Sequence, residues 1–162
     1  MTNLKQKIIS IRNTLDQSRI NELLSESGLK SPTLNNRIEA ANTLGEHKIM
    51  SAYLELCWLA FTDLDKDASK NKSLGRISGY KALKQLGCPN TEQLERIKAV
   101  CADEERVDVL KEFRRILSSF PDNVSLMATI RTIDQKLTQP SFIVECDESD
   151  DLGDDLLNLL SF

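Results

Sequence analysis

Residues 50–61, MSAYLELCWLAF, form the most apolar stretch of this 162-residue sequence. Their apolar side chains are too closely spaced to share one face of a helix, and they include Trp58, Phe61 and three leucines. A helix that is apolar on all sides is stable only when neighbouring elements cover it on several sides. We therefore predict a helix over residues 47–62 at the centre of the core.

Amphipathic patterns on both sides of this stretch predict further helices. Apolar residues recur there every three or four positions, and this spacing places them on one helical face. The predicted helices cover residues 4–24, 31–44, 47–62, 73–86, 90–101, 107–120 and 122–137. The first of them has a predicted break near residues 16–18. No segment alternates as a half-buried strand would, so the predicted fold class is all-α, built from antiparallel helical hairpins.

Capping residues and glycines indicate where these helices begin and end. The predicted N-caps are Ser31, followed by Pro32 at the first helical position, Ser73, Asn90, which forms a capping box with Gln93, and Asp122. The predicted terminating glycines are Gly45 and Gly87.

An internal repeat connects two of the predicted helices. Residues 37–44, RIEAANTL, align with residues 76–83, RISGYKAL, through the pattern R-I-x-small-x-x-x-L, displaced by 39 positions. Helix pairs with a period of about 40 to 47 residues are typical of HEAT and armadillo arrays. The pattern resembles a HEAT-like repeat over about residues 31–138, which implies a short solenoid; the alternative is an irregular bundle of seven helices.

The HEAT-like resemblance also implies particular contacts. In such repeats the arginine of the first helix meets an aspartate from the preceding loop, and Asp63 or Asp65 would be that partner for Arg76. The small residues Ala40 and Gly79 would permit a close approach between helices.

The charge of the chain is unevenly distributed. The sequence has 21 Lys and Arg residues, 25 Asp and Glu residues and a formal net charge of -4. Residues 145–155 contain seven acids and no base, which leaves about +3 on residues 1–144. Acidic runs of this kind repel themselves and stay solvated. We predict an all-helical domain over residues 1–140 and an acidic tail over residues 141–162.

The tail contains leucines as well as acids. If the tail were helical, these leucines would line one face of the helix. It resembles LxxLL and leucine-and-acid motifs, and in style the acidic, Phe-ended tails of bacterial single-stranded DNA-binding proteins. The candidate partner-binding residues are Leu152, Leu156, Leu159, Leu160, Phe162, Asp154 and Asp155. An apolar stripe can enter a groove while the acids meet a basic rim; the alternative is an eighth helix packed on the body.

The densest basic segment is the second candidate site. Its members are Lys66, Lys70, Lys72, Arg76, Lys81 and Lys84. A basic cluster on one face of a helical array can bind phosphates by releasing counterions. Because a body charge of about +3 is low for that purpose, nucleic-acid binding is the alternative function, and an acidic peptide fits the charge as well.

The loop after residue 62 contains aspartates with EF-hand spacing. Asp63, Asp65 and Asp67 begin the run, but the sixth position is Ala68 instead of glycine and the twelfth is Leu74 instead of glutamate. Without the sharp turn and the bidentate ligand a calcium site is not expected. We interpret the segment as a solvated loop.

Composition argues against most catalytic chemistry. The single histidine, His47, excludes sites that need two imidazoles, and no phosphate-binding or nucleophile-elbow motif occurs. The cysteines, at positions 57, 88, 101 and 146, form no CxxC pair, so we expect no structural zinc. We predict no cofactor, no metal and no enzymatic activity.

The remaining expectations concern the compartment and the partners. No apolar run approaches the ~20 residues of a membrane helix, and the N-terminal stretch does not resemble a secretory signal. We expect a cytoplasmic protein with reduced thiols that acts as an adaptor or regulator by binding a protein partner. The sequence does not indicate an oligomeric state.

Overall fold

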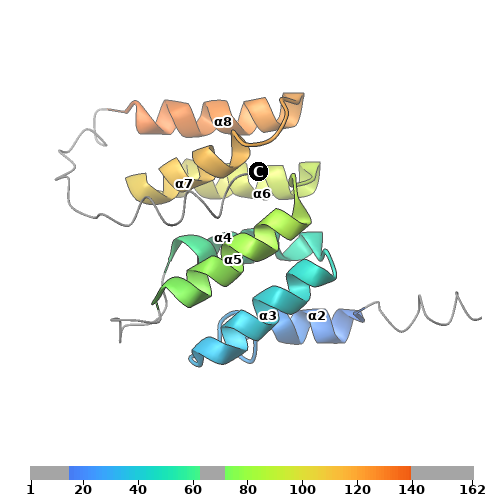
Figure 1. The fold of residues 1–162 in the computed structure, drawn as a ribbon. Coiled ribbons are helices and arrows are strands. Elements are labelled where there is room, and N and C mark those ends of the chain that lie inside the picture. The colour runs from blue at the N-terminus through green and yellow to red at the C-terminus, as the bar shows by residue number, and fades with distance from the viewer. Residues whose placement is uncertain (1–14, 63–71, 140–162) are drawn as a thin grey trace, which may run out of the picture.

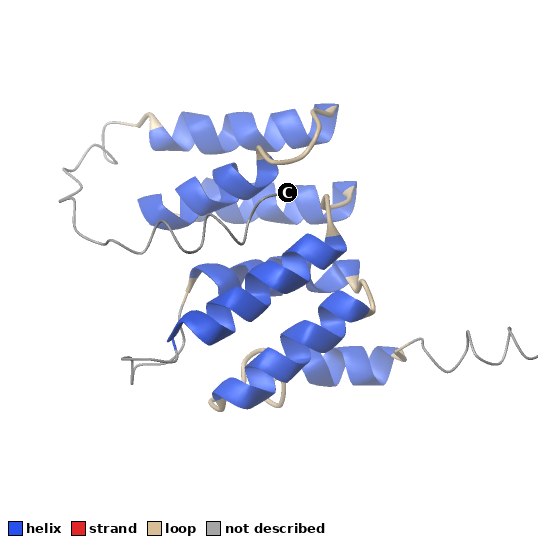
Figure 2. Cartoon of the chain, in the orientation of Figure 1, coloured by secondary structure: helices blue, strands red, loops and turns tan. Residues whose placement is uncertain are grey.

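The computed structural model describes residues 15–62 and 72–139. Within these residues the chain forms seven α-helices and one 3-10 turn and contains no strand, which confirms the all-α fold class (Figure 2). The elements are α2 (Gln17–Leu24), α3 (Leu34–Glu46), η1 (Met50–Ala52), α4 (Tyr53–Phe61), α5 (Lys72–Leu86), α6 (Thr91–Asp103), α7 (Val107–Leu117) and α8 (Val124–Leu137). None of these helices is long and apolar enough to cross a membrane.

Three of the predicted N-caps are wrong by one or two residues. Helix α5 begins at Lys72, so Ser73 lies inside the helix and is not its N-cap. Helix α3 begins at Leu34 with Thr33 at its N-cap, because the Ser31 hydroxyl accepts from the Thr33 N–H in a tight turn before the helix. Helix α8 is capped by Asn123 and not by Asp122, and Asn123 Oδ1 accepts from Leu126 N. An asparagine caps a helix as well as an aspartate does, so the sequence alone does not favour Asp122 over Asn123 as the N-cap.

Three predicted helix boundaries are confirmed. Asn90 Oδ1 accepts from Gln93 N at the start of α6, although the side chain of Gln93 accepts from Arg96. Helix α2 begins at Gln17, close to the predicted break, and Asp16 Oδ1 accepts from Arg19 N there. The predicted helical residues 4–14 before the break lie outside the described residues. Helix α5 ends at Leu86, and Gly87 follows it with a φ of 77°, a conformation that favours glycine.

Helix α5 packs against both α3 and α4, and these three helices are called the α3–α5 group (Figure 1). Helices α3 and α5 run parallel, because a Cβ on Gly75 would touch Leu34 at one end and a Cβ on Gly45 would touch Ala82 at the other. Gly45 was predicted to end its helix, but α3 continues through it to Glu46. Because Gly45 has no side chain, α3 can approach α5 closely at this position.

The contact between α4 and α5 depends on a second glycine. A Cβ on Gly79 would lie 2.9 Å from the backbone nitrogen of Ala60, so the two backbones touch without a side chain between them. The expectation that Gly79 permits a close helix approach is confirmed. The two aligned segments of the sequence repeat therefore lie on neighbouring helices, α3 and α5, while the HEAT-like repeat itself stays a prediction.

Helix α8 packs against both α6 and α7, and these three helices are called the α6–α8 group (Figure 1). Lys136 Nζ donates to the carbonyl of Ala102 at the end of α6 with a distance of 2.8 Å. Asp134 of α8 forms an ion pair with Arg114 of α7. The C-terminal end of α8 therefore lies beside α6 and α7.

Helix α4 lies at the centre of the core, as its composition predicts. Tyr53, Leu56 and Ala60 are fully buried, and α4 contacts α5, α6 and α7. The helix is shorter than predicted, because residues 50–52 form the 3-10 turn η1. Trp58 is only half-buried, since it lies at the edge of the core beneath Arg106.

Candidate interaction site

The two helix groups meet along a seam that is closed by aromatic rings. The ring of Phe113 on α7 packs edge-on against Phe61 of α4, with ring centroids 4.8 Å apart and an interplanar angle of 90°. The Phe113 ring also meets Trp58, with centroids 5.9 Å apart and an angle of 87°. Edge-to-face pairs of this kind are favoured by the charge distribution of the rings. Phe113 therefore joins the α6–α8 group to α4.

A polar network crosses the same seam. The hydroxyl of Tyr80 on α5 donates to Glu112 Oε2 on α7 with a distance of 2.8 Å. Arg115 donates to the same oxygen from Nε at 3.1 Å and from a terminal nitrogen at 2.7 Å, and its guanidinium carbon lies 5.5 Å from the centre of the Tyr80 ring. Burial, together with the Glu112 carboxylate, raises the pKa of Tyr80 to about 12. Tyr80 therefore stays a neutral donor at physiological pH.

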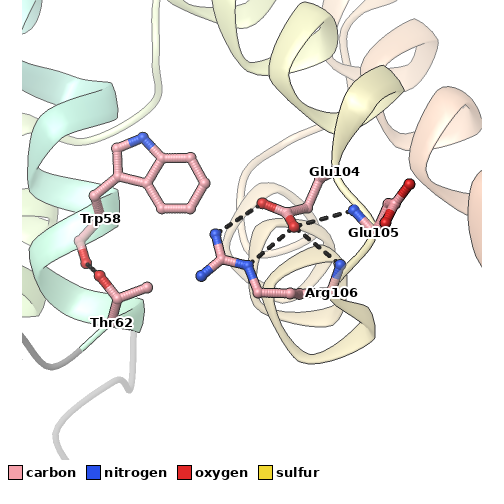
Figure 3. A network of polar contacts seen from close by, with 5 residues as sticks. All are labelled: Trp58, Thr62, Glu104, Glu105 and Arg106. Carbon is pink, nitrogen blue, oxygen red and sulfur yellow. Dashed lines mark hydrogen bonds and ion pairs between the residues drawn. The ribbon is translucent and has the colours of Figure 1, made fainter.

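Glu104 and Arg106 form a clamp at the corner between α6 and α7 (Figure 3). Glu104 Oε1 accepts from the N–H groups of Glu105 and Arg106 and from Arg106 Nε, and its Oε2 accepts from a terminal nitrogen of Arg106. The hydrogen bonds from Arg106 lower the pKa of Glu104. The clamp holds the guanidinium carbon of Arg106 over the Trp58 ring, 5.4 Å from its centre.

An open pocket of about 250 Å³ lies where α4 and α5 meet α7. It is called the seam pocket. Its floor is apolar, since Phe61 and Val109 are both buried. Its charged lining consists of Arg76, Asp108, Lys111 and Glu112. The pocket therefore combines an apolar base with a rim of both charges.

The electrostatic balance of the seam pocket favours anions. Glu112 is already neutralised by its ion pair with Arg115, which leaves Arg76 and Lys111 against Asp108. Arg76 is held in place because its Nε donates to the carbonyl of Ala60 with a distance of 2.9 Å. The rim therefore carries a surplus of one positive charge beside an apolar floor.

The described members of the predicted basic patch do not converge on one spot. Arg76 lines the seam pocket, whereas Lys81 and Lys84 are exposed on the outer face of α5. Helical geometry spreads positions 76 to 84 over ~12 Å along the axis and positions 76 and 81 over ~140° around it. The side chain of Lys72 is not described, and Lys66 and Lys70 lie outside the described residues, as do Asp63, Asp65 and Asp67.

The predicted partner-binding residues of the tail also lie outside the described residues. They are Leu152, Asp154, Asp155, Leu156, Leu159, Leu160 and Phe162. Sequence reasoning missed Asp108, Lys111 and Glu112 altogether, because their spacing of three and one on α7 is typical of any solvated helix face. Only the packing of α7 on α4 turns that face into a pocket wall.

The described cysteines do not form a reactive or metal-binding cluster. Cys57 and Cys101 are buried, and Cys88 is exposed. Burial raises the pKa of Cys57, and it raises the pKa of Cys101 to about 12. No group of three histidine, cysteine or acidic residues within residues 15–62 and 72–139 is placed to hold a metal ion.

Comparisons with known proteins do not assign the chain to a family. No family model, no curated protein and no solved structure matches it.

Proposed function

We propose that this chain is a non-enzymatic adaptor that binds protein partners. The observation that carries the proposal is the seam pocket, with its apolar floor of Phe61 and Val109 inside a charged rim. Its volume of about 250 Å³ lies below the ~300 to 1,000 Å³ that is typical of small-molecule sites. A pocket of this size suits one or two anchoring side chains of a peptide.

The charges at the pocket indicate which peptides it favours. Arg76 and Lys111 face a single unpaired acid, Asp108, because Arg115 neutralises Glu112. An acidic peptide with one leucine or aromatic anchor matches both the rim and the floor, and complementary rim charges raise the rate and the specificity of association. We propose acidic leucine-containing segments as the class of partner.

The tail supplies a second docking element in this proposal. Residues 145–155 carry seven acids and no base, and residues 154–162, DDLLNLLSF, add the leucines. An isolated helix of this length is unstable in water, so the segment is expected to form a helix only when it docks on a protein surface. The chain would then have a receptor site on its body and a ligand motif in its tail.

We also propose that the helices form a short HEAT-like array. Stacked repeats place equivalent helices side by side, and α3 and α5, which carry the repeated pattern, pack in parallel. This parallel packing supports the HEAT-like array, and it does not depend on the proposed role of the tail.

The adaptor function is tested with variants of the full chain. A Leu156→Asp, Leu159→Asp, Leu160→Asp variant is compared with the wild type by affinity capture and mass spectrometry, and each captured protein is purified and titrated by calorimetry. We expect affinity to fall at least tenfold while the melting temperature stays unchanged. A matched variant, Asp122→Asn, Glu92→Gln, Glu95→Gln, alters body charges and should leave binding unchanged.

The opposite result would favour the alternative function. A salt-sensitive gel shift with RNA or DNA that is lost in Lys70→Glu, Lys72→Glu, Lys81→Glu, combined with no protein that binds in purified form, contradicts the adaptor proposal. It would assign the chain to nucleic-acid binding through the basic segment.

A further inference from the structure

We infer that the seam pocket binds the acidic leucine segment of the same chain, residues 152–160, in an intramolecular contact. The inference rests on the proposed function, because it uses the same pocket and the same motif, and it goes further by naming the occupant. Three observations carry it: the apolar floor, the positive surplus of the rim, and the position at which the chain leaves α8.

The apolar part of the segment matches the floor of the pocket. Phe61 and Val109 are buried at its base, and the volume of about 250 Å³ suits one or two leucine-sized side chains. Residues 152–160, LGDDLLNLL, hold five leucines within nine positions. A helical turn of this segment can therefore insert neighbouring leucines from one face.

The acidic part of the segment matches the rim. Asp154 and Asp155 precede Leu156 directly, and the preceding residues 145–151 contain five further acids. The rim offers Lys111, which is exposed on α7, and Arg76, which is oriented by the Ala60 carbonyl. Because the body carries about +3 and the tail is strongly acidic, long-range attraction also favours the contact.

The chain leaves the described fold close to the wall of the pocket. Asp134, near the end of α8, pairs with Arg114 of α7, and Lys111 lies one helical turn before Arg114 on the same helix. Twelve residues, 140–151, separate the described part of the chain from Leu152. Fully extended, they span up to ~40 Å, more than twice the ~16 Å length of α7. The segment therefore has ample reach.

Tethering makes such a contact effective even when each interaction is weak. Attachment through a linker of this length gives an effective concentration of about a millimolar, so a millimolar affinity is enough to keep the pocket substantially occupied. A partner peptide must then displace the segment from the pocket. The contact therefore sets a threshold that partners of the pocket have to exceed.

The test uses the single tryptophan of the chain as an internal donor. Trp58 lies one helical turn from Phe61 at the pocket, and Cys146 lies six residues before Leu152. In the full chain carrying Cys88→Ser, which removes the exposed described thiol, Cys146 is labelled with a fluorophore that accepts energy from tryptophan. We expect efficient transfer that falls on addition of salt and is independent of protein concentration.

Charge reversal at the rim provides the decisive comparison. Lys111→Glu should reduce the transfer to the level of Leu156→Asp, Leu159→Asp, whereas Lys81→Glu, the same change on the outer face of α5, should leave it unchanged. Restoring the attraction with Asp154→Lys, Asp155→Lys in the Lys111→Glu chain should recover the transfer. Circular dichroism melting of each variant confirms that the body stays folded.

Each other outcome overturns the inference. Transfer that is insensitive to Lys111→Glu, or no transfer above that of the leucine variant, places the segment elsewhere, and transfer that rises with protein concentration assigns the contact to a second copy. The proposed function fails separately, because it requires a purified partner whose binding depends on the leucines. Energy transfer in the absence of any purified binding partner would support the intramolecular contact and contradict the adaptor function.

Discussion

The α3–α5 group and the α6–α8 group hold their helices together in different ways. In the α3–α5 group, Gly45 and Gly79 leave no room for a side chain between neighbouring backbones. In the α6–α8 group residues 88–139 contain no glycine, and large side chains such as Leu110, Phe113 and Ile133 fill the interior. The first group is therefore sensitive to added atoms, and the second is sensitive to atoms that are removed.

The largest expected effect is at the residue that joins the two groups. Phe113→Ala removes a buried ring that meets both Trp58 and Phe61, and we expect the free energy of unfolding to fall by about 3 to 5 kcal/mol. Urea unfolding followed by Trp58 fluorescence measures the change. Phe113→Leu keeps most of the side-chain volume and should cost less. An equal loss from both variants would show that the aromatic ring contacts, and not the filled volume, stabilise the seam.

Two glycines on one helix test whether backbone contact is the special feature of the α3–α5 group. A Cβ on Gly79 would lie 2.9 Å from Ala60 N, whereas a Cβ on Gly75 would lie 3.2 Å from the flexible end of Leu34. We expect Gly79→Ala to destabilise the protein by about 1 to 3 kcal/mol. Gly75→Ala should be neutral or stabilise it by up to ~1 kcal/mol, since alanine favours the helix. Thermal unfolding that ranks the two variants in reverse would refute the backbone contact.

Gly87 separates packing effects from backbone effects in the same group. Its φ of 77° is strained for a residue with a side chain, although no atom lies within 4 Å of its added Cβ. We expect Gly87→Ala to cost about 1 kcal/mol. Gly87→Asn should cost less, because asparagine tolerates this conformation. Equal urea midpoints for the wild type and Gly87→Ala would show that the turn relaxes.

The smallest expected effect concerns the clamp at the corner of the α6–α8 group. The pKa of Glu104 is lowered in the folded chain by Arg106, so its contribution is present above its unfolded pKa of about 4.3 and is lost as the pH falls through the lowered pKa. Because the Arg106 side chain is 53% exposed, we expect the contribution to be only ~0.5 to 1 kcal/mol. Urea midpoints at pH 7 and pH 3 measure it, and Glu104→Gln should show a smaller drop between them than the wild type.

A matched ion pair shows whether the clamp is special. Arg114 and Asp134 form an exposed pair between α7 and α8, and Asp134→Asn should cost no more than ~1 kcal/mol. It should leave the emission of Trp58 unchanged, whereas Glu104→Gln should change it, because Arg106 lies over that ring. An identical spectral response of both variants would argue against the clamp.

The helices of this protein could be predicted because their signals are local. The central position of α4 followed from apolar residues on every side, and Asn90 and Gly87 marked two boundaries that the structure confirms. Gly45 misled the same reasoning, since a glycine near a helix end is either a stop or a contact, and its neighbour Ala82 lies on another helix. Such a choice depends on packing that no local pattern contains.

The candidate site was predictable only in part for the same reason. Arg76 was singled out from a basic run, and it does line the seam pocket, but its charged neighbours there come from α7, more than 30 positions away. Asp108, Lys111 and Glu112 have no unusual spacing in the sequence, and the ring of Phe61 was expected only as part of the core. A pocket between helices depends on how two helix surfaces pack against each other, and the sequence of either helix alone does not show this.

By itself the sequence determined that the described part of the chain is helical and where several of its helices begin or end. It also determined which helix is most buried and that an acidic leucine-rich segment follows a weakly basic body. Each of these properties depends on residues within a few turns of one another or on charge that can be counted. The tertiary structure decided that α3 and α5 lie in parallel, that Phe113 closes the seam, and that an open pocket lies beside it. Those features depend on side-chain volume and backbone distance between distant segments, and these are set only when the helices pack.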